Sequence, residues 1–301
     1  MQGGNAGWAE QPPLAVAMRR LGKSAPECAG LIASVTESPN SYTPILDLKK
    51  RLRAIGIECE SDSFERVLLG YAAQESEGKI DSLPVPQSVR DLIRKQFRYL
   101  TQPPGPGGAA LTVDGVENDP FIAASKMCTL RRFPAGPIDW VVSGLPRSWL
   151  LKMPPLDVPK VLKFVFQEFG GTKPVFYVHI AHPPRNRSLI IQKEVRKAYF
   201  RMSQALILQP EIKGIMCATW LHDPAAIEMY PHLAPLNEPY LNLGGKLITN
   251  LGMARLESGF MKYNSERRDL YERGKVSFKS VLAMWPRKAA IEWAQQNASL
   301  E

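Results

Sequence analysis

Residues 175–220 decide the fold and read VFYVHIAHPPRNRSLIIQKEVRKAYFRMSQALILQPEIKGIMCATW. Val175–Ile180 and Ile212–Trp220 are short, mostly apolar runs, which is typical of strands that are buried on both faces of a sheet. The segment between them, Ser188–Leu208, carries apolar side chains at helical spacing: Val195, Tyr199, Met202 and Leu206. A strand, a helix of about 20 residues and a second strand predict a parallel βαβ unit with a right-handed crossover.

The sequence on either side of this unit predicts further strands and helices. Upstream, the pattern predicts a hairpin from Met127–Phe133 and Ile138–Ser143, and Asp157 with Pro159 predicts the start of a helix. Downstream, two strands and two helices are expected at Lys246–Asn250, Val281–Trp285, Glu266–Arg273 and Lys288–Gln296. We therefore expect residues 111–301 to form an α/β (α+β) domain with a mixed sheet and one parallel crossover.

Before this domain, the pattern predicts a small helical region and a linker. Within residues 14–100, apolar side chains recur at helical spacing in three segments: Tyr42–Ile55, Ser63–Gln74 and Ser88–Leu100. Residues 101–110 are rich in proline and glycine and offer little side-chain surface to pack, which predicts a flexible linker. Residues 1–13 are expected to be a disordered tail.

The composition excludes several classes of protein. With 45% hydrophobic and 22% charged residues, the chain is typical of a globular protein and unlike a disordered, collagenous or coiled-coil one. The longest apolar runs are much shorter than the ~18–20 residues of a membrane span, and the N-terminus lacks the pattern of a secretory signal. The four cysteines are widely spaced, so we expect reduced thiols in a cytoplasmic protein. The sequence contains no P-loop, no Rossmann glycine motif and no serine-hydrolase elbow.

Cations are concentrated where the first strand meets the long helix, in a chain of net charge +9. Six of them, opposed only by Glu194, are Arg185, Arg187, Lys193, Arg196, Lys197 and Arg201. Free N–H groups and the dipole at a helix N-terminus attract anions. One interpretation is a site for a phosphate-bearing cofactor or substrate, formed by Arg185, Asn186, Arg187 and Ser188. A solvated helix face and a nucleic-acid surface are the alternatives, although no nucleic-acid-binding motif is present.

Titratable residues follow the second strand of the βαβ unit. Because open α/β sheets bind ligands at the carboxyl ends of parallel strands, these residues are expected near the mouth of a cleft. The candidates for general acid–base chemistry are Tyr230, His222 and Asp223. Asp223 fits the N-cap of a short helix equally well, because Pro224 follows it.

The four histidines raise the question of a metal site. They are His179, His182, His222 and His232, and all lie within one part of the sequence. Imidazoles together with a carboxylate suit zinc or non-haem iron. On a strand, however, positions 179 and 182 point to opposite faces. We therefore expect no metal, and a metal-dependent enzyme that uses the histidines is the third hypothesis for function.

The predicted order of elements resembles the core of the GNAT acyltransferase superfamily. That order is a hairpin, a strand, a long helix, a strand, a short helix and further strands. In that family, acyl-CoA lies in the splay between the two central strands, and its pyrophosphate meets the strand–helix loop. Here that loop is His182–Ser188, which has two prolines and two arginines where the family has glycines. Arg132–Gly136 and Ser143–Trp149 are also similar to segments of uncharacterised bacterial proteins.

The resemblance implies transfer of an acyl group from a CoA-type thioester to the amine of a small-molecule acceptor. Arg185 and Arg187 would anchor the phosphate of acyl-CoA, and Tyr230 or His222 would act as the acid or base. The expected protein is bacterial and cytoplasmic, and it needs neither a metal nor a membrane. The second hypothesis is a non-catalytic module that binds nucleic acid or a protein partner through its basic face.

Overall fold

The computed structural model describes residues 25–35, 43–54, 61–101, 120–145, 151, 153–180, 191–248 and 265–300. Contacts divide the described chain into two compact units. The helical unit contains the described residues up to 83 and the described residues between 90 and 134. The sheet unit contains residues 84–89 and the described residues from 135 onward. The predicted tail at 1–13 and the predicted linker, apart from Thr101, lie outside the described residues, so both stay predictions.

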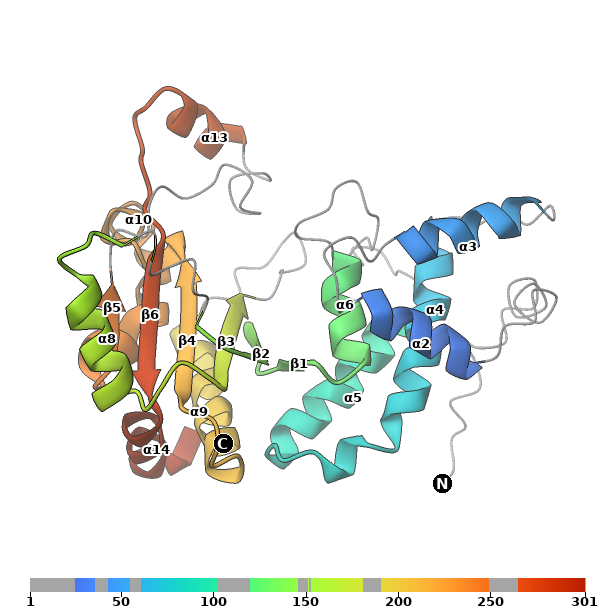
Figure 1. Cartoon of the computed structure of the whole chain (residues 1–301), viewed down its shortest axis with the longest axis horizontal. Coiled ribbons are helices and arrows are strands. Elements are labelled where there is room, and N and C mark those ends of the chain that lie inside the picture. Colours follow the sequence, from blue (N-terminus) through green and yellow to red (C-terminus); the bar gives the residue numbers. More distant parts are fainter. Residues whose placement is uncertain are drawn as a thin grey trace. The chain divides into compact units, whose positions relative to one another are not determined.

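The helical unit is built from amphipathic helices, as the spacing of apolar residues predicts. Its elements are α2 (Ala25–Val35), α3 (Thr43–Ala54), α4 (Ser61–Glu77), η1 (Ile80–Ser82), α5 (Gln87–Thr101), α6 (Pro120–Cys128) and β1 (Arg132–Pro134). Helices α2, α4 and α6 pack on one another (Figure 1). Their buried side chains include Ile32, Leu68 and Phe121, which are fully excluded from solvent. The small helical region that precedes the sheet is therefore confirmed.

The sheet is mixed, and its strand order is β1-β2-β3-β4-β6-β5. Its strands after β1 are β2 (Ile138–Ser143), β3 (Val175–Ile180), β4 (Gly214–Thr219), β5 (Lys246–Ile248) and β6 (Val281–Pro286). The helices of the sheet unit are α8 (Val158–Gln167), α9 (Gln192–Leu208), η2 (Trp220–His222), α10 (Pro224–Met229), η3 (Pro231–Asn237), α11 (Glu238–Asn242), α13 (Ser265–Glu272), α14 (Arg287–Gln296) and η4 (Ala298–Leu300). Strands β3 and β4 are parallel, whereas β4 and β6 are antiparallel. The α/β fold with one parallel crossover is confirmed.

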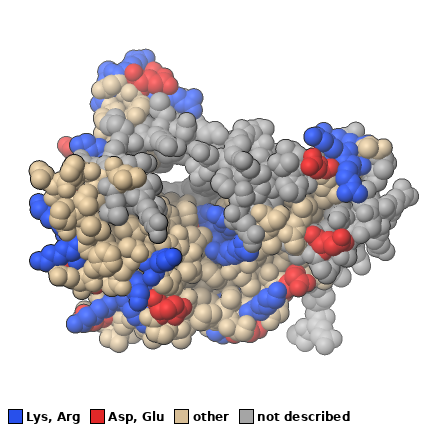
Figure 2. Space-filling view, viewed as in Figure 1, with Lys and Arg blue, Asp and Glu red and all other residues tan. Residues whose placement is uncertain are grey.

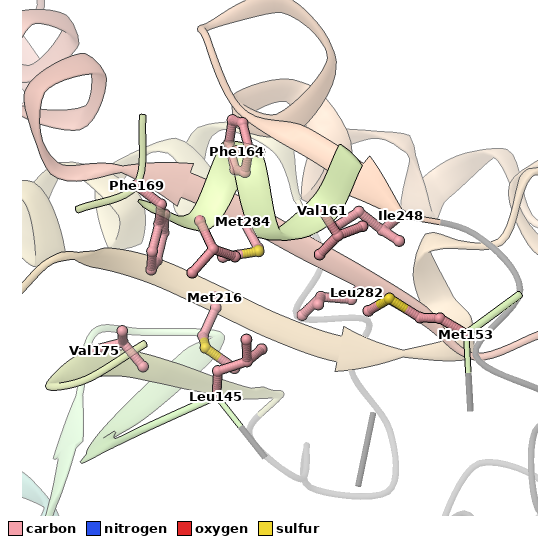
Figure 3. Packing of buried hydrophobic residues seen from close by; sticks show 11 residues of the cluster. Leu145, Met153, Val161, Phe164, Phe169, Val175, Met216, Ile248, Leu282 and Met284 are labelled. Carbon is pink, nitrogen blue, oxygen red and sulfur yellow. The ribbon is translucent and has the colours of Figure 1, made fainter. Parts of the chain in front are cut away.

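Helices cover both faces of this sheet. Helix α8 packs on one face, where Val161 and Phe164 contact the buried cluster of Met216, Leu282 and Met284 (Figure 3). On the other face, the Tyr199 ring of α9 meets the Trp285 ring edge-on, with centroids 5.9 Å apart. A sheet that is covered on both faces explains why its central strands are almost wholly apolar. Within the described residues, no helix has the length and apolar content that crossing a membrane requires.

Two element boundaries differ from those that the sequence predicts. The strand predicted at Met127–Phe133 is wrong, because α6 extends to Cys128 and only Arg132–Pro134 is extended. An apolar run this short fits a helix end as well as it fits a strand. The helix predicted from Ser188 begins at Gln192, since Ile191 has an extended backbone.

Gly214, the first residue of β4, lies close to the backbone of β6 and to the ring of Phe169, which follows α8. A Cβ at this position would lie 2.4 Å from the Trp285 carbonyl oxygen and 2.6 Å from Cε2 of Phe169. The first of these atoms is backbone and cannot move aside without disturbing the β4–β6 pairing. The absence of a side chain at position 214 is therefore a packing requirement.

We predict that Gly214→Ala lowers the free energy of unfolding of the sheet unit by about 3 kcal/mol. This loss is at the upper end of those typical of added side-chain atoms in a well-packed core. Urea denaturation followed by tryptophan fluorescence measures this loss. Gly78→Ala is the matched control, because a Cβ there would meet nothing within 4 Å. Equal stability of the two variants would contradict the packing role of Gly214.

Candidate functional site

The two parallel central strands are paired only at their beginning. The register joins Phe176 to Ile215 and Tyr177 to Met216, and no further pair is formed between these described strands. By contrast, β2 pairs with β3, and β4 with β6, along all six residues. The arrows of β3 and β4 separate toward their tips in Figure 1. The centre of the sheet therefore opens at the carboxyl ends of its parallel strands, where open α/β sheets bind ligands.

Beyond the last β3–β4 pair, side chains form hydrogen bonds with backbone groups that a longer ladder between the two strands would pair. The backbone of Ala218, two residues beyond the last paired residue of β4, forms a hydrogen bond with the Tyr177 hydroxyl. The Cys217 Sγ donates to the Val178 carbonyl oxygen at 3.5 Å. Backbone polar groups in a sheet interior need partners, and the partners of these two groups are side chains.

Tyr177 is the functional candidate that the sequence analysis missed. Its ring lies 5.0 Å from the His179 ring, measured between centroids, and packs against the hydrophobic cluster beneath α8. Burial raises the pKa of the Tyr177 hydroxyl, so this group is protonated at neutral pH and can donate a proton. In the sequence, Tyr177 is one more residue of an apolar strand, and only the register shows that it borders the opening.

His222 lies immediately after β4 in η2 and is buried, with 2% of its surface exposed. Its Nδ1 is 2.7 Å from Oδ1 of Asn237, which accepts the hydrogen bond. Within the described residues, Nε2 has no hydrogen-bond partner. Burial lowers the pKa of His222 to about 4, although the bond to Asn237 favours the charged form. The imidazole is therefore neutral and shielded, which favours a structural role.

A chain of aromatic hydroxyls continues from His222 into the core. The Tyr240 ring meets the imidazole edge-on, with centroids 5.2 Å apart. The Tyr240 hydroxyl lies 3.4 Å from that of Tyr199, and Tyr199 donates to the Leu236 carbonyl at 3.0 Å. Burial raises the pKa of both tyrosines, so both hydroxyls are protonated. The polar groups behind β4 thus hold η3 and α11 against α9.

Asp223 uses both carboxylate oxygens on backbone groups. Oδ1 accepts from Ala225 N at 3.1 Å at the start of α10, and Oδ2 accepts from the backbone N–H of Lys279. The side chain is also buried, with 6% exposed. This is the N-cap geometry that the Asp-Pro sequence predicts, extended by a tertiary contact. The geometry favours capping over proton transfer for Asp223.

Tyr230 and His232 lie at the end of α10 and the start of η3. Tyr230 is partly buried, and its ring is 6.1 Å from the His232 ring. Its acid–base role stays a prediction. Among the described residues, no group of three or more histidine, cysteine, aspartate or glutamate side chains is arranged to hold a metal ion. His182 lies outside these residues.

The predicted phosphate site at Arg185, Asn186, Arg187 and Ser188 lies outside the described residues and stays a prediction. Two of the helical cations serve the tertiary structure. Arg196 lies 3.4 Å from the Glu238 carboxylate, donates to Asn297 at 3.0 Å and stacks over Trp293. Arg201 donates to the Ala135 carbonyl. On the face shown in Figure 2, the described Lys and Arg lie in separate groups with Asp and Glu among them.

The sequence matches no protein-family model and no curated protein. Among solved structures, an acyltransferase in complex with decanoyl-CoA matches with a TM-score of 0.47 and 10% sequence identity. The match covers 91% of this chain and 83% of that chain. This is a weak resemblance, and at such values it does not establish a shared fold.

We predict that His222 makes the protein sensitive to mild acid. The folded-state pKa is about 4 and the unfolded value is 6.5, so the unfolded chain binds more protons between these pH values. The stability that comes from keeping His222 neutral is fully present above pH 6.5, and it is lost as the pH falls toward 4. From pH 7 to pH 5 the free energy of unfolding should fall by about 2 kcal/mol from this residue.

Denaturant titrations at the two pH values test this expectation. In His222→Asn, the amide can still donate to Asn237 but does not titrate, so the loss between pH 7 and pH 5 should shrink. His232→Asn removes an exposed histidine and should retain the loss. An unchanged pH dependence in His222→Asn would show that other groups cause the acid sensitivity.

Proposed function

We propose that this protein transfers an acyl group from a CoA-type thioester to the amine of a small molecule. The observation that carries the proposal is the splay between β3 and β4, whose pairing ends after Tyr177 and Met216. The resemblance of the sequence to the GNAT superfamily implies that the acyl donor lies in such a splay. A sheet gains stability from each ladder hydrogen bond, so a gap between its two central strands calls for a functional explanation.

The residues at the splay fit an elongated donor with amide groups. The Ala218 backbone bonds the Tyr177 hydroxyl, and the Val178 carbonyl accepts from the Cys217 thiol. The amides of a CoA-type thioester could form backbone hydrogen bonds there, as an added strand does at a sheet edge.

The chemistry needs one proton donor near the sulfur. When the amine nitrogen attacks the thioester carbonyl, the carbon–sulfur bond breaks and the amine loses a proton, while the leaving thiolate gains one. We assign the protonation of the thiolate to Tyr177, because it carries a hydroxyl proton and is the last residue of β3 that pairs with β4 before the splay. The amine proton passes to solvent water, and Tyr230, which is only partly buried, remains a sequence-based candidate for the acid–base chemistry.

The phosphate end of the donor would lie at the strand–helix loop. Helix α9 begins at Gln192, and its N-cap residue, Ile191, makes no side-chain cap, so the first N–H groups are not capped by that residue. A phosphate near a helix N-terminus is favoured by these groups and by the helix dipole. We propose that Arg185, Asn186, Arg187 and Ser188 complete this binding site.

The double variant Arg185→Ala, Arg187→Ala is predicted to weaken acetyl-CoA binding by roughly two to four decades, since each charge-assisted contact is worth ~1.5–3 kcal/mol. Isothermal titration calorimetry measures the affinity. The matched control, Lys50→Ala with Arg53→Ala, removes two exposed cations from α3 and should leave the affinity unchanged. If the parent chain binds no acyl-CoA, or if both double variants bind it equally well, the proposed site is wrong.

Tyr177→Phe is predicted to lower the rate of acyl transfer by about 100-fold or more while the affinity for acetyl-CoA changes little, because only the proton donor is lost. The substitution removes one hydrogen bond and should cost about 1 kcal/mol of stability. Release of CoA thiol in the presence of a panel of primary amines measures the rate. Tyr271→Phe, on α13, is the control. An unaltered rate in Tyr177→Phe would exclude this hydroxyl as the proton donor.

A further inference from the structure

The chain between α10 and β5 contains two short helices, η3 (Pro231–Asn237) and α11 (Glu238–Asn242). We refer to residues 231–242 as the η3–α11 segment. Helix α11 has only five residues, and Pro235 inside η3 lacks the N–H that a helix hydrogen bond requires. Because short helices form few internal hydrogen bonds, contacts with the rest of the sheet unit hold this segment in place.

Two side chains of α9 contact the η3–α11 segment. The Tyr199 hydroxyl donates to the Leu236 carbonyl oxygen at 3.0 Å. Arg196, from the same helix, lies 3.4 Å from the Glu238 carboxylate. Burial raises the pKa of Tyr199, so the hydroxyl keeps its proton and this hydrogen bond does not change in mild acid. These contacts join η3 and α11 to α9.

A third contact joins the segment to η2, and this one depends on a titratable group. Nδ1 of His222 donates to Oδ1 of Asn237 at 2.7 Å, and both side chains are buried. With the imidazole proton on Nδ1, a second proton has to bind at Nε2. Within the described residues, Nε2 of His222 has no hydrogen-bond partner. A proton taken up in the closed structure would therefore create a buried charge whose N–H lacks an acceptor, which is costly.

Neighbouring charges do not compensate a charge on His222. The titratable side chains that the surrounding described elements carry are Asp223, Glu228, Tyr230, His232, Glu238, Tyr240, Lys275 and Lys279. Asp223 accepts hydrogen bonds from two backbone N–H groups, and Glu238 faces Arg196. The others are exposed or partly exposed, except Tyr240, which is buried. Burial is the main cause of the low pKa of His222, which is about 4.

We infer that mild acid releases the η3–α11 segment from α9 and η2, and that uptake of a proton by Nε2 of His222 causes this release. Once the segment has moved away, water reaches the imidazole and stabilises its charged form. Strand β4 stays in place, because it pairs with β6 along all six residues. Local opening of a weakly held segment needs less free energy than unfolding of the whole unit. This inference does not depend on the proposed acyl transfer.

Hydrogen–deuterium exchange of the full chain at pH 7 and pH 5, corrected for the intrinsic exchange rates, tests the inference. With a pKa of about 4 in the closed structure and 6.5 after release, the opening equilibrium of residues 231–242 should rise about 20-fold between the two pH values. At both pH values these residues should exchange faster than β6. A low concentration of urea should accelerate exchange in β6 much more than in the segment, because local opening exposes little surface.

Two variants test whether His222 is the cause. In His222→Asn the side chain does not titrate, so the 20-fold rise should disappear. Asn237→Asp places a carboxylate beside the imidazole and favours its charged form, so acid should no longer promote release. The matched control, His232→Asn, removes an exposed histidine and should respond to acid like the parent chain.

Equal protection of residues 231–242 and β6 at pH 5 in the parent chain overturns the inference, because the segment then opens only when the whole unit unfolds. A parental response to acid in both His222→Asn and Asn237→Asp overturns it as well, because another group then takes up the proton.

Discussion

The pairing of β4 with β6 along all six residues is the constraint on which the rest of the sheet unit depends. With β4 held against β6, and β3 held equally fully against β2, the parallel contact between β3 and β4 is the least paired of these three junctions. The close approach at Gly214 fixes the beginning of β4 against β6 and α8. Strands β3 and β4 therefore pair at their amino ends and not at their carboxyl ends, where Tyr177 and Cys217 supply hydrogen bonds.

The polar residues behind β4 show how a buried network can resemble an active site in the sequence. His222, Asn237, Tyr240 and Tyr199 hold the irregular segments after β4 against α9. Burial keeps the histidine neutral and the tyrosines protonated, so the core carries no uncompensated charge. The requirement that buried polar groups find partners explains why residues suited to catalysis gather here without solvent access.

The βαβ unit could be predicted because two kinds of pattern agreed over 175–220: two apolar runs and one helical periodicity between them. The strand predicted at 127–133 failed because no local pattern shows that Leu130 adopts a left-handed backbone. For the candidate site, the sequence placed His222 and Asp223 correctly after the second strand, and it even suggested the N-cap. It could not reveal Tyr177, because the end of a strand pairing depends on neighbours that are far away along the chain.

For the cations of α9, too, the sequence does not show which side chains have partners in the folded chain. In the sequence, Lys193, Arg196, Lys197 and Arg201 form one basic stripe, yet Arg196 and Arg201 are held by partners within the sheet unit. Arginine suits this use, because its planar guanidinium can bond a carboxylate, an amide oxygen and an aromatic face together, as Arg196 does. Lys193, by contrast, is exposed. A count of positive residues therefore overstates how many cations of the described part of α9 can reach a ligand.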